Sequence, residues 1–471
     1  MTRHTGFGPR RWSKFSMLTV LTMLIVLVLS ACGDNTTAPA PATTAASAAT
    51  TAAAVATTAA ISATTAASAA TTAAAAAGPK VAPGNLTVWA VGSEDDAKVF
   101  QSAADAFGKA NPGVKVTIQP VSWDDAHAKD LTAATSGQGP DMITGGLSWG
   151  IEFGTKGAMV DLAAKYPDVV SNIKKLAQPG IYNAVATLDG KIYGVPSDLT
   201  VMMMYYRTDL LKAVGIEKLP TTWDELTTAI TKLQATGSKG YAESWGNTSW
   251  LGWYGFLYGA GGSLYDAKCT KVNVNSPEAV KSLQFYSELY SKYKAPTDST
   301  VDFEGGFEKG DYPILMQGNW DITGLESGHP GVKGKWAAAP IPAGPSGKKT
   351  AFIGGRMIGI MNFSKNQDTA AAFINYLYSD EAATMTSNKA AELSALWLPP
   401  RVDMVSKLQI PDDRKAALTA QLNDAGGPPN CKGWEESQNT LDKKVQEVIL
   451  SKADPQKALD EAAGVMTQNL K

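Results

Sequence analysis

Strand-like and helix-like hydrophobic patterns alternate along the chain from about residue 84 onwards. Residues 85–91 are mostly apolar and predict a first strand, and apolar residues alternate with polar ones along 114–121, as in a strand with one buried face. Residues 97–111 and 123–135 instead repeat their apolar positions with the helical period of about 3.6 residues. Strands that alternate with helices predict an α/β fold with a largely parallel, doubly wound sheet.

The loops after the first and third predicted strands carry polar and aromatic side chains. Ser93 and Glu94 follow the first strand, and Ser148 and Trp149 follow a third short strand at 141–143. In doubly wound sheets, ligands bind outside the carboxyl ends of the strands. We therefore expect these four residues on the ligand-binding side of the sheet.

The stretch 188–211 combines a predicted hairpin with a buried strand. Asp189 and Gly190 form a turn signal, Pro196 ends the second arm, and residues 201–206 are apolar on both faces. One interpretation is a hairpin and core strand of any α/β protein. The other is a crossing between two lobes, with Asp198 at the seam.

The length and the net charge of the chain limit the classes of protein to which it can belong. The chain has 471 residues, more than one core usually organises, so we expect two lobes. A net charge of −2 and no basic stripe argue against nucleic acid as a partner. The 12 Trp residues, several beside Gly, Ser or Asn, fit a neutral partner.

The N-terminal region has the pattern of a targeting segment. Basic residues precede an apolar run at 17–29, which ends in Leu-Ser-Ala before Cys32, as in bacterial lipoprotein signals. An ordinary secretory signal is the alternative. We expect a signal peptide at 1–31, lipidation of Cys32, and a disordered Ala/Thr-rich tether at 32–83.

The two other cysteines are Cys269 and Cys431. Outside the cell they could form one disulfide, or remain two buried thiols. Neither has zinc ligands near it in the sequence, because the only histidines are His4, His127 and His329. We expect no metal and no cofactor.

Several motifs in order give the chain a family resemblance. They are Gly137-x-Gly-Pro-Asp141, Asp189-Gly-Lys-Ile-Tyr-Gly-Val-Pro196, Tyr206-Arg-Thr-Asp-Leu-Leu211, Pro220-x-Thr-Trp-Asp-Glu-Leu226, Gly318-Asn-Trp320 and Gly354-Gly355. From residue 86 to the end, the chain resembles the solute-binding proteins of bacterial ABC importers, the group that includes maltose-binding protein. The resemblance implies two α/β lobes, 84–197 plus 341–395 and 198–340 plus 396–471, that close over a ligand by hinge motion. It places crossings after Pro196, near Pro340 and near Leu396.

The resemblance also implies a substrate class and partners. Aromatic faces and polar side chains suit a mono- or oligosaccharide, and Trp320 is expected to be the main stacking platform. The expected binding residues are Trp320, Asp198, Ser93, Glu94, Ser148, Trp149, Trp245, Asn247, Trp250, Arg356, Trp434 and Glu435. We expect a monomer at the outer face of the membrane, held by its lipid anchor, that delivers sugar to the transmembrane subunits of an ABC permease.

Two alternatives remain open at this point. A secreted carbohydrate-active enzyme could use a carboxylate pair from Glu243, Glu304, Glu308, Glu435 and Glu436, although no pattern fixes two of them at one site. A receptor for another solute is the second alternative. Arg356 would favour a phosphodiester, whereas Glu94, Asp198 and Asp321 would favour a polyamine. We expect a binding protein, not an enzyme.

Overall fold

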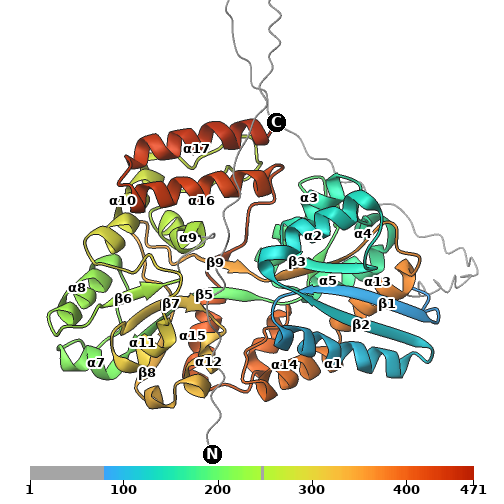
Figure 1. The fold of residues 1–471 in the computed structure, drawn as a ribbon, viewed down its shortest axis with the longest axis horizontal. Coiled ribbons are helices and arrows are strands. Elements are labelled where there is room, and N and C mark those ends of the chain that lie inside the picture. The colour runs from blue at the N-terminus through green and yellow to red at the C-terminus, as the bar shows by residue number, and fades with distance from the viewer. Residues whose placement is uncertain (1–78, 245–248) are drawn as a thin grey trace, which may run out of the picture. The chain divides into compact units, whose positions relative to one another are not determined.

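The computed structural model describes residues 79–244 and 249–471, and these residues belong to one unit of the fold. Their strands form two sheets (Figure 1). The first sheet has the order β2-β1-β3-β10-β4. Its strands are β1 (Gly84–Val91), β2 (Val114–Val121), β3 (Met142–Gly146), β4 (Val195–Pro196) and β10 (Arg356–Ile360). Strand β1 pairs in parallel with β2 and β3, as the alternation of strands with helices along the sequence predicts.

We call this sheet, with the helices packed around it, the first lobe. These helices are α1 (Glu94–Ala110), α2 (Trp123–Ser136), α3 (Trp149–Thr155), α4 (Leu162–Lys165), α5 (Pro167–Leu176), α6 (Pro179–Val185), α13 (Gln367–Leu377) and α14 (Asp380–Glu392). Helix α1 covers β1 and β2, whereas α2 and α3 pack beside β3.

The second sheet has the order β11-β9-β5-β7-β6, and β8 also pairs with β5. Its strands are β5 (Thr200–Arg207), β6 (Tyr241–Glu243), β7 (Ile314–Gly318), β8 (Trp336–Ala339), β9 (Ala351–Gly354) and β11 (Ala425–Gly426). The central strand β5 is buried along most of its length, as its continuous apolar run predicts.

This second sheet and its helices form the second lobe. The helices are α7 (Thr208–Ala213), α8 (Trp223–Gln234), α9 (Ser249–Gly259), α10 (Pro277–Ser291), α11 (Phe303–Lys309), α12 (Asp321–Gly328), α15 (Asp412–Leu422), α16 (Trp434–Leu450) and α17 (Pro455–Asn469), with 3-10 turns at Pro330–Val332 and Val402–Lys407. Helices α16 and α17 lie side by side (Figure 1), and α16 packs on α9 and α10.

The chain crosses between the sheets within the stretch that the sequence singles out. Strand β4 ends the hairpin in the first sheet at Pro196, and β5 begins in the second sheet at Thr200. Asp198 lies between them. A bridge between Leu199 and Leu398 brings the segment that follows α14 alongside this crossing, and the crossing near Leu396 stays a prediction. The crossing interpretation of this stretch therefore describes the structure better than a hairpin and strand within one sheet.

The remaining crossing differs from its prediction near Pro340. Strand β9 pairs with β5 in the second sheet, and β10 pairs with β3 in the first, so the chain crosses at Gly355. The expected first-lobe segment 341–395 therefore includes second-sheet residues 351–354. A Pro-rich segment marks irregular backbone but not which sheet the next strand joins. Gly355 has φ +126°, and a Cβ there would lie 2.3 Å from Asp198 O, so the two crossing segments touch where only glycine fits.

Two further features bear on the predictions. Cys269 and Cys431 are joined by a disulfide with a Cα–Cα distance of 5.4 Å, which decides between the two states left open by the sequence. Within residues 79–244 and 249–471, no helix has the length and apolar character needed to cross a membrane.

Candidate functional site

Asp198 and Arg356, both predicted to bind ligand, are paired with each other at the crossing. Arg356 Nη2 donates to Asp198 Oδ2 at 2.6 Å, and Arg356 N donates to Asp198 Oδ1 at 2.7 Å. Arg356 also donates to Val91 O and to Asp96 Oδ1. Burial disfavours the guanidinium charge, but the two carboxylates outweigh it and raise the pKa of Arg356. The pair therefore holds the crossing segments to the start of α1; ligand binding by either residue stays a prediction.

Ser93 and Glu94 begin helix α1 on the exposed side of that same region. The Ser93 hydroxyl accepts from Asp96 N at 3.1 Å, and Ser93 N donates to Asp96 Oδ2 at 2.8 Å, which makes a capping box. Asp96 in turn binds Arg356. Ser93 thus has a local structural role, and Glu94 is exposed; ligand binding by either residue stays a prediction.

Ser148 and Trp149 begin α3, directly after strand β3. The Trp149 indole is 8% exposed and lies over glycine backbone, since a Cβ at Gly145 would meet its ring at 2.2 Å. The rings of His127 and Trp123 approach it at 4.9 and 5.9 Å between centroids. An aromatic cluster therefore lies at the carboxyl end of the third strand, where the sequence predicts ligand contacts.

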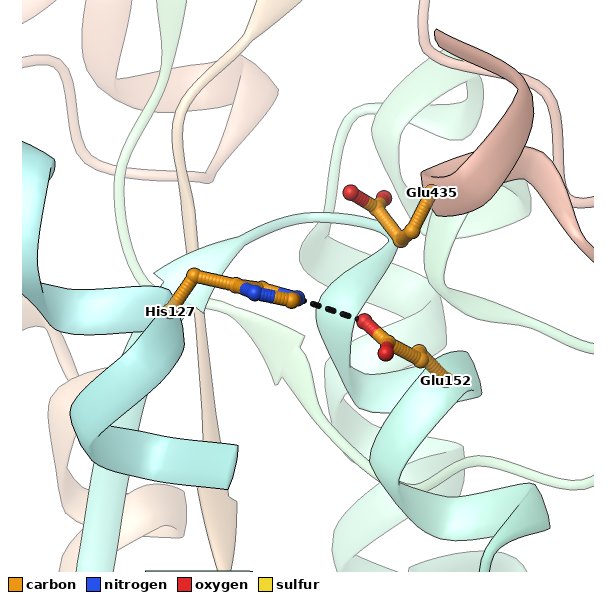
Figure 2. Close-up of side chains that lie close together, drawn as sticks. All are labelled: His127, Glu152 and Glu435. Carbon is orange, nitrogen blue, oxygen red and sulfur yellow. Dashed lines mark hydrogen bonds and ion pairs between the residues drawn. The ribbon is translucent and has the colours of Figure 1, made fainter. Parts of the chain in front are cut away.

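Glu435 of α16 reaches this cluster from the second lobe (Figure 2). His127 Nε2 and Glu152 Oε2 share a hydrogen bond of 2.7 Å, and Lys156 Nζ donates to Glu152 Oε1 at 2.6 Å. One ligand atom from each of His127, Glu152 and Glu435 lies within 4.8 Å of the others. Lys156 also approaches Glu436 Oε1 at 3.7 Å. The two lobes thus meet through charged side chains beside Trp149.

These contacts shift the charge states of the three groups. The hydrogen bond from Glu152 raises the pKa of His127 above its ordinary value. Burial acts to raise the pKa of Glu152, but His127 and Lys156 outweigh it, and the pKa is lowered. Burial raises the pKa of Glu435 to about 7, while Ser148 and His127 oppose the rise. Glu435 therefore faces an ionised His127–Glu152 pair as a carboxyl that is only partly ionised near neutral pH.

Trp434 precedes Glu435 in α16 and packs against Trp250 within the second lobe. Their ring centroids lie 5.1 Å apart, edge to face, and Trp250 also packs on Phe352 at 5.2 Å. Trp434 is 2% exposed. Among the described residues, neither Trp434 Nε1 nor Glu435 Oε1 has a hydrogen-bond partner, although both atoms are buried. Buried polar atoms without partners are uncommon in folded proteins, and a bound solute, ion or water can satisfy them.

Trp320 stands apart from this cluster, at the start of α12. Its side chain is 44% exposed and its ring lies against strand β7, because a Cβ at Gly318 would meet it at 1.9 Å. An indole that is supported on one side and open on the other can stack on a flat ligand. Trp245 and Asn247 lie outside the described residues. The structure therefore brings Ser148, Trp149 and Glu435 together around His127. It pairs Trp250 with Trp434 within the second lobe. Separately, it links Ser93, Asp198 and Arg356 through Asp96.

The sequence did not single out His127 or Glu152 as site residues. His127 is on α2, which follows the second parallel strand, and Glu152 is on α3, three residues after Trp149. Their position after strands at the carboxyl edge of the sheet was the available signal. A separate surface hollow of about 920 Å³ lies between α1 and α14 and is lined by residues such as Gln101, Asp105 and Asn388, none of which was predicted.

Glu243, a candidate for the enzyme alternative, is enclosed in the second lobe. It is 2% exposed and accepts a hydrogen bond of 2.8 Å from Tyr290. Burial raises its pKa to about 7, although hydrogen bonds from Tyr290, Tyr286 and Tyr241 oppose the rise. A buried carboxyl held among tyrosines has no access to a substrate bond.

Glu243 gives a testable pH dependence of stability. Its pKa is raised on folding, so its contribution is complete below about pH 4.5 and is lost as the pH rises through about 7. Between pH 4.5 and 8, the free energy of unfolding of the wild type should fall about 3 kcal/mol further than that of Glu243→Gln. Urea unfolding at several pH values measures this difference, and parallel curves for the two proteins would contradict it.

A two-sheet α/β fold whose chain crosses repeatedly between lobes, with polar and aromatic residues where the lobes meet, defines a solute-binding protein of the periplasmic type. Residues 91–384 match the family model described as bacterial extracellular solute-binding protein, and the chain belongs to this family. Its members bind solutes for ABC transporters and are not enzymes.

Individual relatives agree with the family assignment. A binding protein of Brucella abortus is 25% identical over 375 residues, covering 77% of this chain and 88% of the relative. The sugar-binding protein MalE of Xanthomonas citri has a similar structure, with a TM-score of 0.71 at 25% identity, covering 82% of this chain and 97% of that one. An ABC transporter solute-binding protein of Thermotoga lettingae, bound with α-D-tagatose, has a TM-score of 0.71 at 24% identity, covering 82% and 100%.

Proposed function

We propose that this protein binds a mono- or oligosaccharide outside the cell membrane and delivers it to an ABC permease, while a lipid on Cys32 holds it at the membrane. The observation that carries the proposal is that two consecutive residues of α16 each bury a polar atom without a hydrogen-bond partner among the described residues, the indole nitrogen of Trp434 and Oε1 of Glu435. Sugar-binding relatives of similar fold support the substrate class.

The chemistry of this cluster suits a sugar. The indole N–H can donate to a hydroxyl oxygen, and the Glu435 carboxyl can accept from a hydroxyl or donate to it, depending on its proton. Aromatic rings offer apolar faces for the C–H surfaces of a pyranose. A sugar hydroxyl both donates and accepts, so it can satisfy either kind of orphaned atom, which a purely apolar solute cannot do.

The alternative of an anionic solute has less support. Arg356 was the residue that favoured a phosphodiester, but Asp198 and Asp96 already hold its guanidinium. An anion would have to displace two carboxylates from a buried cation, at a cost of several kcal/mol. A polyamine remains a useful comparison, because Glu435 and Glu152 are both acidic.

The crossings suggest how binding leads to delivery. The segments around Asp198 and Gly355 touch at the point where the chain passes between sheets. Rotation about such short connections would move the lobes as rigid bodies, and a ligand that contacts both lobes favours the form in which they approach. The permease would then recognise that form.

Thermal unfolding against a panel of solutes tests the proposal. A sugar present at 100 times its Kd should stabilise the protein by about 2.7 kcal/mol, seen as a rise in Tm. The panel contains mono- and oligosaccharides, spermidine and glycerophosphocholine. The sugar assignment fails if no sugar raises the Tm, or if only spermidine or the phosphodiester does. Sugar products in the mixture would overturn the assignment as a binding protein.

Trp320→Ala, measured with the sugar that shifts the wild type most, tests the expected stacking platform. Because Trp320 is 44% exposed, its truncation should leave the fold intact, whereas affinity should fall at least about tenfold. Leu188→Ala is the matched control, since Leu188 is a 57% exposed apolar residue of the first-lobe hairpin. Unchanged sugar affinity in Trp320→Ala would remove this residue from the site.

A further inference from the structure

The cluster of His127, Glu152 and Glu435 has an arrangement that sugar binding does not require. Its members come from α2, α3 and α16, so one imidazole and one carboxylate belong to the first lobe and one carboxylate to the second (Figure 2). One potential ligand atom of each lies within 4.8 Å of the other two. The sequence predicts no metal site, because it contains neither HExxH nor a cysteine-based metal motif.

Each carboxylate in the cluster has one oxygen held by a nitrogen donor outside it. Lys156 donates to Glu152 Oε1, which leaves Oε2 on the side of His127. The Gln438 amide donates to Glu435 Oε2. Outer donors of this kind orient the ligands of metal sites. The ring of His127 is oriented in turn by Trp149 and Phe153, at 4.9 and 5.4 Å between centroids.

A second observation points to a bound cation. Glu435 is 6% exposed, and its Oε1 has no hydrogen-bond partner among the described residues. A buried carboxylate oxygen without a partner is costly. Ser148 and His127 offset the burial of Glu435 only in part, since its pKa is still raised to about 7. A divalent cation between the three side chains would satisfy this oxygen and offset the charge of both carboxylates.

We propose that His127, Glu152 and Glu435 form a site for one divalent transition-metal ion of the Zn²⁺ class that links the two lobes. Imidazole nitrogen and carboxylate oxygens are ligands that Zn²⁺ accepts, and three protein ligands leave a further position open. Bond lengths of about 2.0–2.2 Å require the three atoms to draw around the ion, with the His127–Glu152 hydrogen bond replaced by metal bonds. Lys156 stays on the other oxygen of Glu152.

Calorimetric titration of Zn²⁺ into protein freed of metal by a chelator tests this site directly. We expect one ion per chain, and at least tenfold weaker binding in both His127→Asn and Glu435→Gln. Two variants serve as matched controls. Glu436→Gln changes the next residue of α16, which pairs with Lys156, and His329→Asn removes a second His–Glu pair, His329 Nδ1 to Glu308 Oε2 at 3.3 Å. Both should bind Zn²⁺ like the wild type.

The outcomes separate this proposal from the proposed function. No heat with Zn²⁺, or binding that survives in both His127→Asn and Glu435→Gln, would overturn the metal site. If His329→Asn weakened Zn²⁺ binding as much as His127→Asn does, the ion would be assigned to the other His–Glu pair. That result would also overturn the proposed metal site. Circular dichroism of each variant establishes that it is folded, and Glu435→Gln keeps the shape of the side chain. The sugar panel is run in chelator, so its result stands whether or not Zn²⁺ binds.

Discussion

Replacing Arg356 with Met is expected to lower the free energy of unfolding by about 3–5 kcal/mol. The change leaves Asp198, which is 2% exposed, as a buried charge without its guanidinium partner. It also removes donors to Val91 O and Asp96 Oδ1. These contacts join the crossing segments to the start of α1. Their loss should therefore weaken the connection between the lobes. Urea unfolding at pH 7 measures the change.

A double-mutant cycle and a control ion pair on the surface test whether the loss of stability comes from the Asp198–Arg356 pair. Asp198→Asn with Arg356→Met should cost less than the sum of the single changes, because the double variant buries no unpaired charge. Asp95→Asn breaks the ion pair with Lys98, at 2.7 Å, whose side chains are 52% and 56% exposed. That exposed pair should contribute little to stability, because solvent screens it. A loss of similar size in Arg356→Met would show that the crossing does not depend on this pair.

The elements that the sequence predicts well are those whose pattern is local. Strand β5 is apolar on both faces and buried, and the alternation of strands and helices in 84–146 gives the parallel half of the first sheet. The crossing at Gly355 was misplaced because β9 and β10 are consecutive short strands with one glycine between them. Their local patterns are alike, and only long-range pairing, with β5 and with β3, assigns them to different sheets.

The candidate site shows the same division. Position after a strand predicts that Ser148 and Trp149 lie at the sheet edge, and the structure places them beside Glu435, which is nearly 300 residues away in the sequence. What position cannot predict is which polar groups satisfy one another. Asp198 and Arg356 were both expected to bind ligand, and they bind each other. His127 has no motif around it, and its proximity to Glu152 and Glu435 arises only from the packing of three helices.

Removing the disulfide, by Cys269→Ser with Cys431→Ser, is expected to lower the free energy of unfolding by about 3–5 kcal/mol. The two cysteines are 162 residues apart, and in the chain-entropy model a closed loop of that length restricts the unfolded chain by about 5 kcal/mol. Urea unfolding without reductant measures the change. Reductant should lower the stability of the wild type by a similar amount and leave the double variant unchanged; an effect of reductant on the variant would contradict this account.

The same change is expected to weaken ligand binding, because the disulfide lies just before the second-lobe part of the candidate site. Cys431 O accepts a hydrogen bond from Trp434 N at 3.3 Å, so the bridge anchors the segment that begins α16 with Trp434 and Glu435. Ordering one loosened residue on binding costs about 1–2 kcal/mol, which corresponds to roughly tenfold in affinity. Calorimetry at a temperature where both proteins are folded measures the affinity. Equal affinities would mean that the packing of Trp434 against Trp250 holds this segment without the bridge.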